Sequence, residues 1–143
     1  MTATQTCPDC VVGAEWLMKP VVYVAGPLNA PDAAGYLANV GAMIRTALLI
    51  RKNGFPVIVP CLDLLLGVVS AAEWDAMGYE DYFGHNQALL AKCDALFCIA
   101  HSPGTDKEIA FARALGKPVC ATVLDLESLV RKDGKWVLPA LPA

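Results

Sequence analysis

The sequence predicts a single α/β domain with three layers, flavodoxin-like or Rossmann-like, built on a parallel sheet of about five strands. Short runs of apolar and β-branched residues are apolar throughout instead of alternating with polar ones, which is typical of strands buried on both faces. Longer segments with apolar residues at helical spacing lie between these runs. The length of 143 residues suits one domain, which we expect to span residues 20–143 after an N-terminal leader at 1–19.

Strands and helices are expected to alternate along most of the chain. The expected strands are 21–25, 55–60, 95–100 and 119–124. The expected helices are 14–18, 36–52, 82–92, 105–115 and 126–131. Gly54 and Gly116 come directly after two of these helices, where glycine commonly ends a helix. The chain after the last helix, through Asp133 and Gly134, is expected to be a tail.

The composition argues against several classes of partner. The net charge is −3 and the lysines and arginines are scattered, so a nucleic-acid polymer is not an expected partner. The longest continuous apolar run, Leu64–Val69, is far shorter than the roughly 18 residues that span a membrane. No basic and apolar secretion signal begins the chain, so a cytoplasmic location is expected. The high apolar content of 56% indicates surface that is covered by a second subunit.

The cysteine pattern does not predict a metal site. Cys7 and Cys10 form a CxxC pair, but zinc would need two further ligands at similar spacing, and the sequence has no second such pair. A redox pair should follow a strand and open a helix, whereas this pair precedes the first expected strand. A mobile tail is therefore favoured over a functional pair, and neither a metal nor a cofactor is expected.

Two turns are predicted to lie together at one edge of the sheet. Right-handed crossovers place every turn from strand to helix at the same edge, and ligands of such folds bind at the carboxyl ends of the strands. The turns at 26–32 and 101–105 follow the first and third expected strands. Gly26 and Pro27 in the first of them could cradle a phosphate or a sugar edge, or form a plain chain turn.

The segment from Ser102 to Glu108 carries the strongest signal for chemistry. Ser102, Gly104 and Thr105 would form an anion-binding turn, because glycine admits a ligand close to the backbone and the next helix offers free amides. Glu108 is expected in the first helical turn, ionised by the helix dipole and able to attack a sugar carbon. The alternative is a capping box over Thr105–Glu108, in which the glutamate only folds back on the cap.

Aromatic side chains near acidic residues form a second candidate region. Trp74 and Tyr82 lie among carboxylates and could stack on a nucleobase. A subunit contact or a lid packed on the core explains the same cluster equally well.

Several segments together resemble the nucleoside 2-deoxyribosyltransferase-like superfamily. The resemblance covers residues 21–123, and its most specific part is the block from Ser102 to Pro118 that includes Glu108. Its segments are Tyr23-Val24-Ala25-Gly26-Pro27, Lys52-Asn53-Gly54-Phe55, Cys93-Asp94-Ala95-Leu96, Ser102-x-Gly104-x3-Glu108 and Ala114-Leu115-Gly116-Lys117-Pro118.

The resemblance implies an enzyme that cleaves the N-glycosidic bond of 2′-deoxynucleosides or their monophosphates. Glu108 stands where the family has its nucleophile for C1′, and Tyr23 and Gly26 stand where the family frames its site. Members of the family form dimers or larger assemblies, so a homodimer or homotetramer is implied here. The small-molecule partner would be a nucleoside or nucleotide.

Two positions bear on the choice of reaction. The residue six before the glutamate is Ser102, as in the family's 5′-monophosphate N-hydrolases, whereas transferases acting on free nucleosides have aspartate there. An aspartate would repel a phosphate and a serine would not. The family usually has an assisting aspartate where this chain has Asn86, which cannot take a proton. Asp81 or His85 would then substitute, or the activity is altered or lost.

The leading hypothesis from the sequence is therefore an N-hydrolase of a (deoxy)nucleoside 5′-monophosphate, with Glu108 as the nucleophile. The alternatives are a nucleoside 2-deoxyribosyltransferase that acts on free nucleosides and a catalytically silent nucleotide-binding module. A structural homodimer module, in which Glu108 only caps a helix, is the third.

Overall fold

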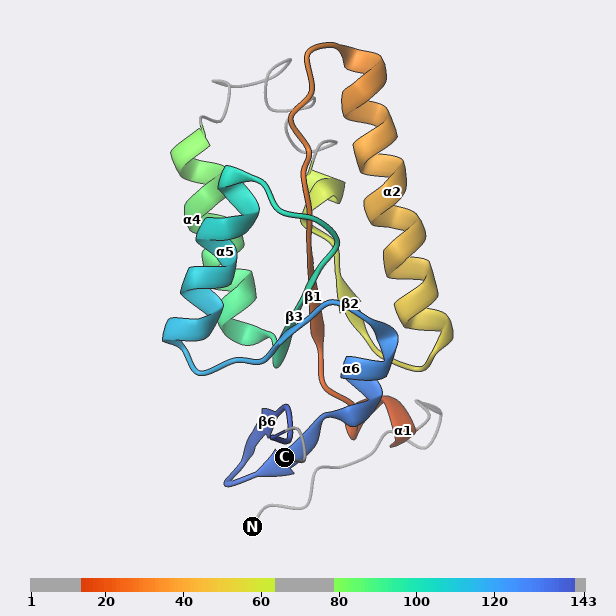
Figure 1. The fold of residues 1–143 in the computed structure, drawn as a ribbon, viewed down its shortest axis with the longest axis vertical. Coiled ribbons are helices and arrows are strands. Elements are labelled where there is room, and N and C mark those ends of the chain that lie inside the picture. Colours follow the sequence, from red (N-terminus) through yellow and green to blue (C-terminus); the bar gives the residue numbers. More distant parts are fainter. Residues whose placement is uncertain (1–13, 64–78, 141–143) are drawn as a thin grey trace, which may run out of the picture.

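The centre of the fold is a parallel sheet of four strands (Figure 1). The computed structural model describes residues 14–63 and 79–140. The strands are β1 (Val22–Ala25), β2 (Val57–Ile58), β3 (Ala95–Cys98) and β4 (Val119–Cys120), in the order β2-β1-β3-β4. The helices are α1 (Ala14–Leu17), α2 (Ala33–Lys52), the 3-10 turn η1 (Pro60–Asp63), α4 (Tyr79–Lys92), α5 (Pro103–Ala114) and α6 (Val123–Ser128). The predicted α/β class is confirmed, with four strands in the described part of this sheet where about five were expected.

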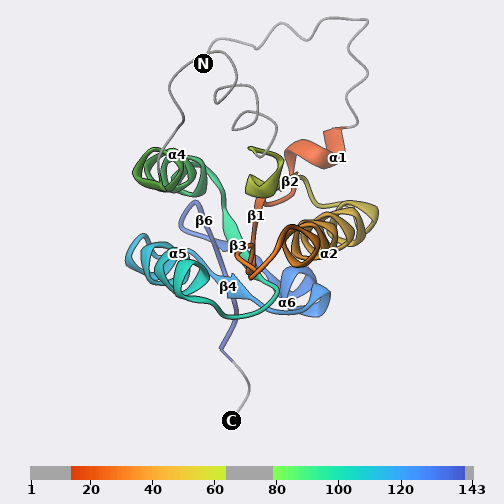
Figure 2. The ribbon, with the colours of Figure 1, turned by 90° about the horizontal axis from the view of Figure 1, so that it is seen from above.

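Helices cover both faces of the sheet and create two separate cores (Figure 2). Helices α2 and α6 lie on one face, and α4 and α5 lie on the other. Successive residues of a strand point to opposite faces, so Val22 and Val24 of β1 join the core under α2 and α6. Tyr23 and Ala25 join the core under α4 and α5. This alternation directs the phenol of Tyr23 toward α5.

The strand order creates a topological switch point between β1 and β3. The chain leaves β1 through α2 to reach β2 on one side, and it continues from β3 through α5 to β4 on the other. In open α/β sheets, this divergence opens a crevice at the carboxyl ends of the two central strands. The loop after β1 and the turn before α5 therefore lie at the same edge, as the sequence predicted.

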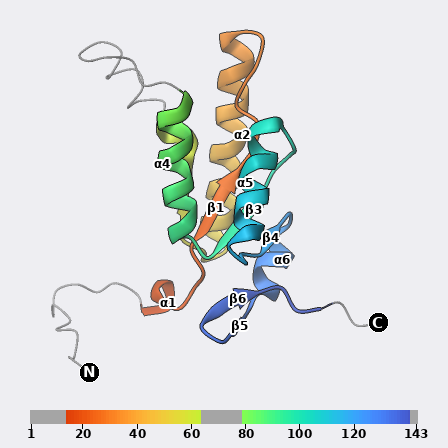
Figure 3. The ribbon, with the colours of Figure 1, turned by 90° about the vertical axis from the view of Figure 1, so that its left-hand side faces the viewer.

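The C-terminal part differs most from the expected elements. The fourth strand ends at Cys120 because Thr122 begins a helix there, with Thr122 and Asp125 in a reciprocal capping box. The segment expected to be a tail is an antiparallel hairpin of β5 (Val130–Lys132) and β6 (Lys135–Val137), drawn at the same end of the molecule as α1 (Figure 3). Asp133 and Gly134 have φ angles of 51° and 77° at its turn, as a tight hairpin turn requires.

Helix α2 is 20 residues long and largely apolar. By length and composition alone it could cross a membrane, although Asn39 and Arg45 interrupt its apolar residues, so that it holds no continuous apolar run of about 18 residues. In the fold it is a layer of the domain, because Met43, Ala47 and Ile50 pack into the core beside β1. The side chain of Leu48 on the outer side of α2 is 58% exposed. The helix begins at Ala33 because the side chain of Asp32 caps its N-terminus.

Candidate active site

A hydrogen bond between β1 and α5 forms the centre of the candidate site. The phenol of Tyr23 donates to Oε1 of Glu108 across 3.1 Å. Tyr23 is fully buried, and Glu108 is mostly buried. These two residues are 85 positions apart in the sequence, and the parallel packing of β1, β3 and α5 brings them together. Two of the three residues predicted to carry the chemistry are thus in contact.

Helix α5 begins three residues earlier than the capping-box alternative requires. Ser102 is the N-cap, and its hydroxyl oxygen accepts from the amide of Thr105 at 3.1 Å. Glu108 is therefore the sixth residue of the helix, beyond the first turn. Both the capping role for Glu108 and the expectation that the helix dipole holds it ionised are wrong, because the dipole acts within the first turn.

Burial instead makes the carboxyl of Glu108 a weak acid. Loss of water around it raises its pKa from 4.5 to about 7, and the hydrogen bond from Tyr23 opposes this rise. Burial also raises the pKa of Tyr23 far above its ordinary value, and the charge of Glu108 adds to the rise. Tyr23 therefore keeps its proton and acts as a donor. A carboxyl poised near neutrality inside a fold is typical of catalytic groups.

The free oxygen of Glu108 is available for chemistry. Among the described residues, Glu108 has no hydrogen bond or ion pair besides the one from Tyr23. One carboxylate oxygen is thus held in place while the other can attack an electrophilic carbon or take a proton. This arrangement suits a nucleophile better than a structural carboxylate, which would have several donors.

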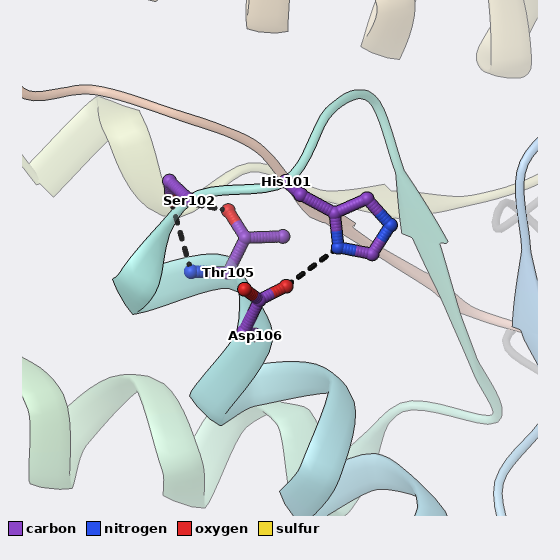
Figure 4. Close-up of polar contacts among 4 residues, drawn as sticks. All are labelled: His101, Ser102, Thr105 and Asp106. Atoms are coloured by element: carbon purple, nitrogen blue, oxygen red, sulfur yellow. Dashed lines mark hydrogen bonds and ion pairs between the residues drawn. The ribbon is translucent and has the colours of Figure 1, made fainter.

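The turn before α5 uses most of its polar groups internally (Figure 4). The hydroxyl of Ser102 also donates to Oγ1 of Thr105, at 2.9 Å. The exposed side chains of His101 and Asp106 lie 2.5 Å apart. Thr105 is 2% exposed, so its hydroxyl serves this turn. The hydroxyl groups of Ser102 and Thr105 therefore stabilise the turn and the start of α5.

The same turn offers few backbone donors to an anion. Pro103 has no amide hydrogen, the amide of Thr105 binds the Ser102 hydroxyl, and the amide of Asp106 binds the Ser102 carbonyl. Gly104 thus supplies the remaining amide of the first helical turn. The carboxylate of Asp106 adds a negative charge beside it. An anion would be held here by fewer groups than the sequence suggested.

Gly26 and Pro27 continue β1 at the switch point. The amide of Ile99 donates to the carbonyl of Ala25, at 2.9 Å, so the two central strands stay paired beyond their ends. A Cβ added at Gly26 would lie 3.3 Å from the Ile99 side chain. Close packing therefore accounts for glycine at this position. The phosphate-cradling interpretation of Gly26 and Pro27 stays a prediction.

Tyr82, predicted to stack on the base, and Asn86, predicted to be catalytic, lie on α4 and make no hydrogen bond to Glu108 within the described residues. Tyr82 and Asn86 are one helical turn apart on α4, which packs against α5 (Figure 3). The side-chain oxygen of Asn86 is buried and has no hydrogen-bond partner in the described part of the chain. Trp74, like Cys7 and Cys10, lies outside the described residues.

One carboxylate of this region, Asp63, was not predicted from the sequence. Asp63 ends η1, directly after β2, and its Oδ2 lies 3.5 Å from Nδ1 of His85 on α4. Its charge contributes to the raised pKa of Tyr23. The signal that was available is its position after an expected strand at the binding edge of the sheet. Within residues 14–63 and 79–140, no cluster of three or more potential ligands could hold a metal ion.

The chain is similar in structure to a 2-deoxyribosyltransferase from the psychrotolerant bacterium Bacillus psychrosaccharolyticus. The similarity covers 69% of each chain, at 22% sequence identity and a TM-score of 0.50. The two proteins share a fold. No protein-family model matches the chain, and no curated protein matches it in sequence.

Proposed function

We propose that this protein cleaves the N-glycosidic bond of a (deoxy)nucleoside 5′-monophosphate with Glu108 as the nucleophile. The observation that carries the proposal is the buried Glu108 carboxyl, held by the Tyr23 phenol at the switch point of the sheet. The fold shared with an enzyme that is named for deoxyribosyl transfer supports the same class of reaction.

The reaction would proceed through a covalent intermediate. A carboxylate oxygen of Glu108 bonds to C1′ of the sugar while the bond from C1′ to the base nitrogen breaks, and the electron pair leaves with the base. Water then attacks C1′ and gives up a proton, the departed base takes up a proton, the ester bond to Glu108 breaks, and the sugar phosphate is released with the Glu108 carboxylate regenerated. Tyr23 would keep the attacking carboxylate oriented, because its phenol holds one of the two oxygens.

Transfer of the sugar between free nucleosides is a second candidate. The structural neighbour is named as a transferase, and the turn before α5 has one available amide beside the charge of Asp106. Both reactions share the same intermediate and differ in whether water or a second base attacks it. They also differ in whether the site accepts a phosphate.

The test is to incubate the protein with each deoxynucleoside, each 5′-monophosphate and the ribonucleotide counterparts, and to measure free base by chromatography. Base released from monophosphates supports the proposal. Exchange of bases between free nucleosides would favour the transferase. If stoichiometric enzyme releases no base from any of them, the catalytic proposal fails and a nucleotide-binding module is favoured.

Ser102→Asp is expected to separate the phosphate role of this residue from its capping role. Aspartate is as good an N-cap as serine, so the denaturation midpoint should stay nearly unchanged. Its charge would repel a 5′-phosphate, so kcat/KM for monophosphates should fall at least about tenfold, which corresponds to about 1.4 kcal/mol. Free nucleosides should be affected much less.

Ser102→Ala is the comparison variant for this prediction. It removes the cap and should cost about 1 kcal/mol of stability without adding a charge. Equal losses of activity toward nucleosides and monophosphates in Ser102→Asp would argue against a phosphate site at this turn.

We also propose that the protein acts in the cytoplasm as a homodimer or homotetramer. Exposed leucines support the assembly, since Leu48 and Leu62 line an apolar surface hollow of about 240 Å³ between α2 and η1. Such side chains are commonly covered by a partner. Sedimentation should give at least twice the 15.2 kDa of one chain, and a monomer at micromolar concentration would contradict this.

A further inference from the structure

Within residues 14–63 and 79–140, two buried side-chain oxygens have no hydrogen-bond partner, and they are Oδ1 of Asn86 and Oδ2 of Asp63. Both atoms are acceptors, since an amide oxygen and a carboxylate oxygen accept hydrogen bonds. A buried acceptor without a donor costs stability, and most such atoms in folded proteins are paired. A ligand that donates hydrogen bonds would remove this cost.

Asn86 stands in line with buried residues of α4. Leu90 lies one helical turn further along the helix and is fully buried in the core that also contains Tyr23 and Ala112. Glu108 lies one turn before Ala112 on α5, just as Asn86 lies one turn before Leu90 on α4. Both helices begin at the carboxyl edge of the sheet and pack against each other (Figure 3). Asn86 and Glu108 therefore lie at the same end of this core, toward the binding edge.

Asp63 belongs to the same edge of the sheet. It ends η1, which directly follows β2 and packs against β1. Its Oδ2 lies 3.5 Å from Nδ1 of His85 but forms no hydrogen bond with it. His85 directly precedes Asn86 on α4, and Tyr82, predicted to stack on a base, lies one turn before Asn86. The two oxygens without a donor thus adjoin the same turn of α4.

The bases of nucleotides differ in what they offer to such acceptors. Adenine and cytosine carry an exocyclic amino group, which has two N–H donors. Guanine and thymine carry an acceptor oxygen at the corresponding position, as hypoxanthine and uracil do. An amino group would supply donors to the two protein oxygens. A base oxygen would leave them without a donor and would be repelled by the Asp63 carboxylate.

We propose that Asn86 and Asp63 select nucleotides whose base carries this amino group, which are those of adenine and cytosine. Oδ1 of Asn86 accepts one of the amino hydrogens, and Oδ2 of Asp63 accepts the other. Asn86 is then a specificity-determining residue, and its amide takes no part in proton transfer. The inference rests on the proposed cleavage by Glu108, because it names the base of the same substrate.

Binding to the Glu108→Gln protein tests this selection apart from the reaction. Calorimetric titration would compare the 5′-monophosphate of 2′-deoxyadenosine with that of 2′-deoxyinosine, and that of 2′-deoxycytidine with that of 2′-deoxyuridine. The members of each pair carry an amino group or an oxygen at the same ring carbon. The amino nucleotide should bind about 10- to 100-fold more tightly, because the oxygen leaves buried acceptors without donors. Base release by the wild type should follow the same order.

Asn86→Leu, made in the same protein, tests the role of the amide. Leucine is similar in size and has no acceptor, so most of the preference for the amino nucleotides should disappear. The denaturation midpoint should stay unchanged or increase, because the variant removes a buried polar atom that has no partner. Asp63→Asn should weaken the preference by a smaller factor, because it keeps an acceptor oxygen and loses the charge. Gln87→Leu is the matched control, since Gln87 is the next, half-buried amide of α4, and it should leave the preference unchanged.

The outcomes separate this inference from the proposed function. Equal binding of the two members of each pair would overturn the inference, even if the wild type releases base. An unchanged preference in Asn86→Leu would also overturn it, and a lower denaturation midpoint in that variant would show that the amide is structural. A preference for the amino nucleotides without any base release would support the selection and overturn the proposed cleavage. Failure to bind any of the four nucleotides would overturn both.

Discussion

Replacing Glu108 by glutamine is expected to abolish base release and to stabilise the protein at alkaline pH. Glutamine keeps the shape and can still accept the hydrogen bond from Tyr23, but it cannot form the glycosyl ester. Loss of an enzyme's nucleophile commonly reduces kcat by several orders of magnitude, up to about 10⁶-fold. Chromatography of free base at high enzyme concentration measures this loss.

The gain in stability follows from the raised pKa of Glu108. The pKa is about 7 in the folded protein and 4.5 when the group is in water. Between these values the folded state binds more protons than the unfolded state, so the free energy of unfolding falls as pH rises. Above pH 7 the folded protein contains a poorly solvated charge that costs about 3 kcal/mol relative to the neutral acid. Glutamine has no such charge.

Chemical denaturation at pH 5 and pH 8 tests this directly. Glu108→Gln should differ little from the wild type at pH 5 and should be more stable at pH 8. Glu127→Gln on α6 is the matched control, because Glu127 is exposed, and it should show no such difference between the two pH values. Retained turnover in Glu108→Gln would rule out Glu108 as the nucleophile, and an equal effect at both pH values would contradict the raised pKa.

The central elements of the fold could be predicted because local and global signals agree there. The run before Gly26 is apolar at every position, and the structure buries all four residues of β1. The same argument failed after Cys120, where Val123 and Leu124 suit a strand by propensity but follow the Thr122 cap. A cap sets the local backbone and overrides the preference of the residues that come after it.

The candidate site was only partly predictable for a different reason. The importance of Glu108 followed from its motif, but its pKa depends on burial inside the fold, which no local pattern shows. The pair of Asp63 and His85, 3.5 Å apart, joins η1 to α4. Contacts between distant segments need the sheet order, which the sequence alone left open.

Replacing Tyr23 by phenylalanine is expected to shift the pH dependence of the reaction as well as its rate. Among the described residues the phenol is the one group that lowers the pKa of Glu108, so its removal should raise that pKa further above 7. The nucleophile must be ionised, and base release should therefore increase with pH through a midpoint near 7 in the wild type and at a higher pH in the variant. At pH 7 the variant should be about 10- to 100-fold slower, from the lost ionisation and the lost orientation together.

The free energy of unfolding of Tyr23→Phe distinguishes the loss of a hydrogen bond from a simple loss of packing. The phenylalanine ring fills the space of the tyrosine ring. The variant should therefore lose about 1–3 kcal/mol of stability, because a buried carboxyl group is left without its hydrogen-bond donor. That cost should be larger at pH 8, where Glu108 is ionised, than at pH 5. Tyr36→Phe is the control, since the described structure gives its hydroxyl no hydrogen bond. A Tyr23→Phe variant with an unchanged pH profile would show that the phenol only packs, because a donor to an ionisable nucleophile must alter the pH at which that nucleophile becomes active.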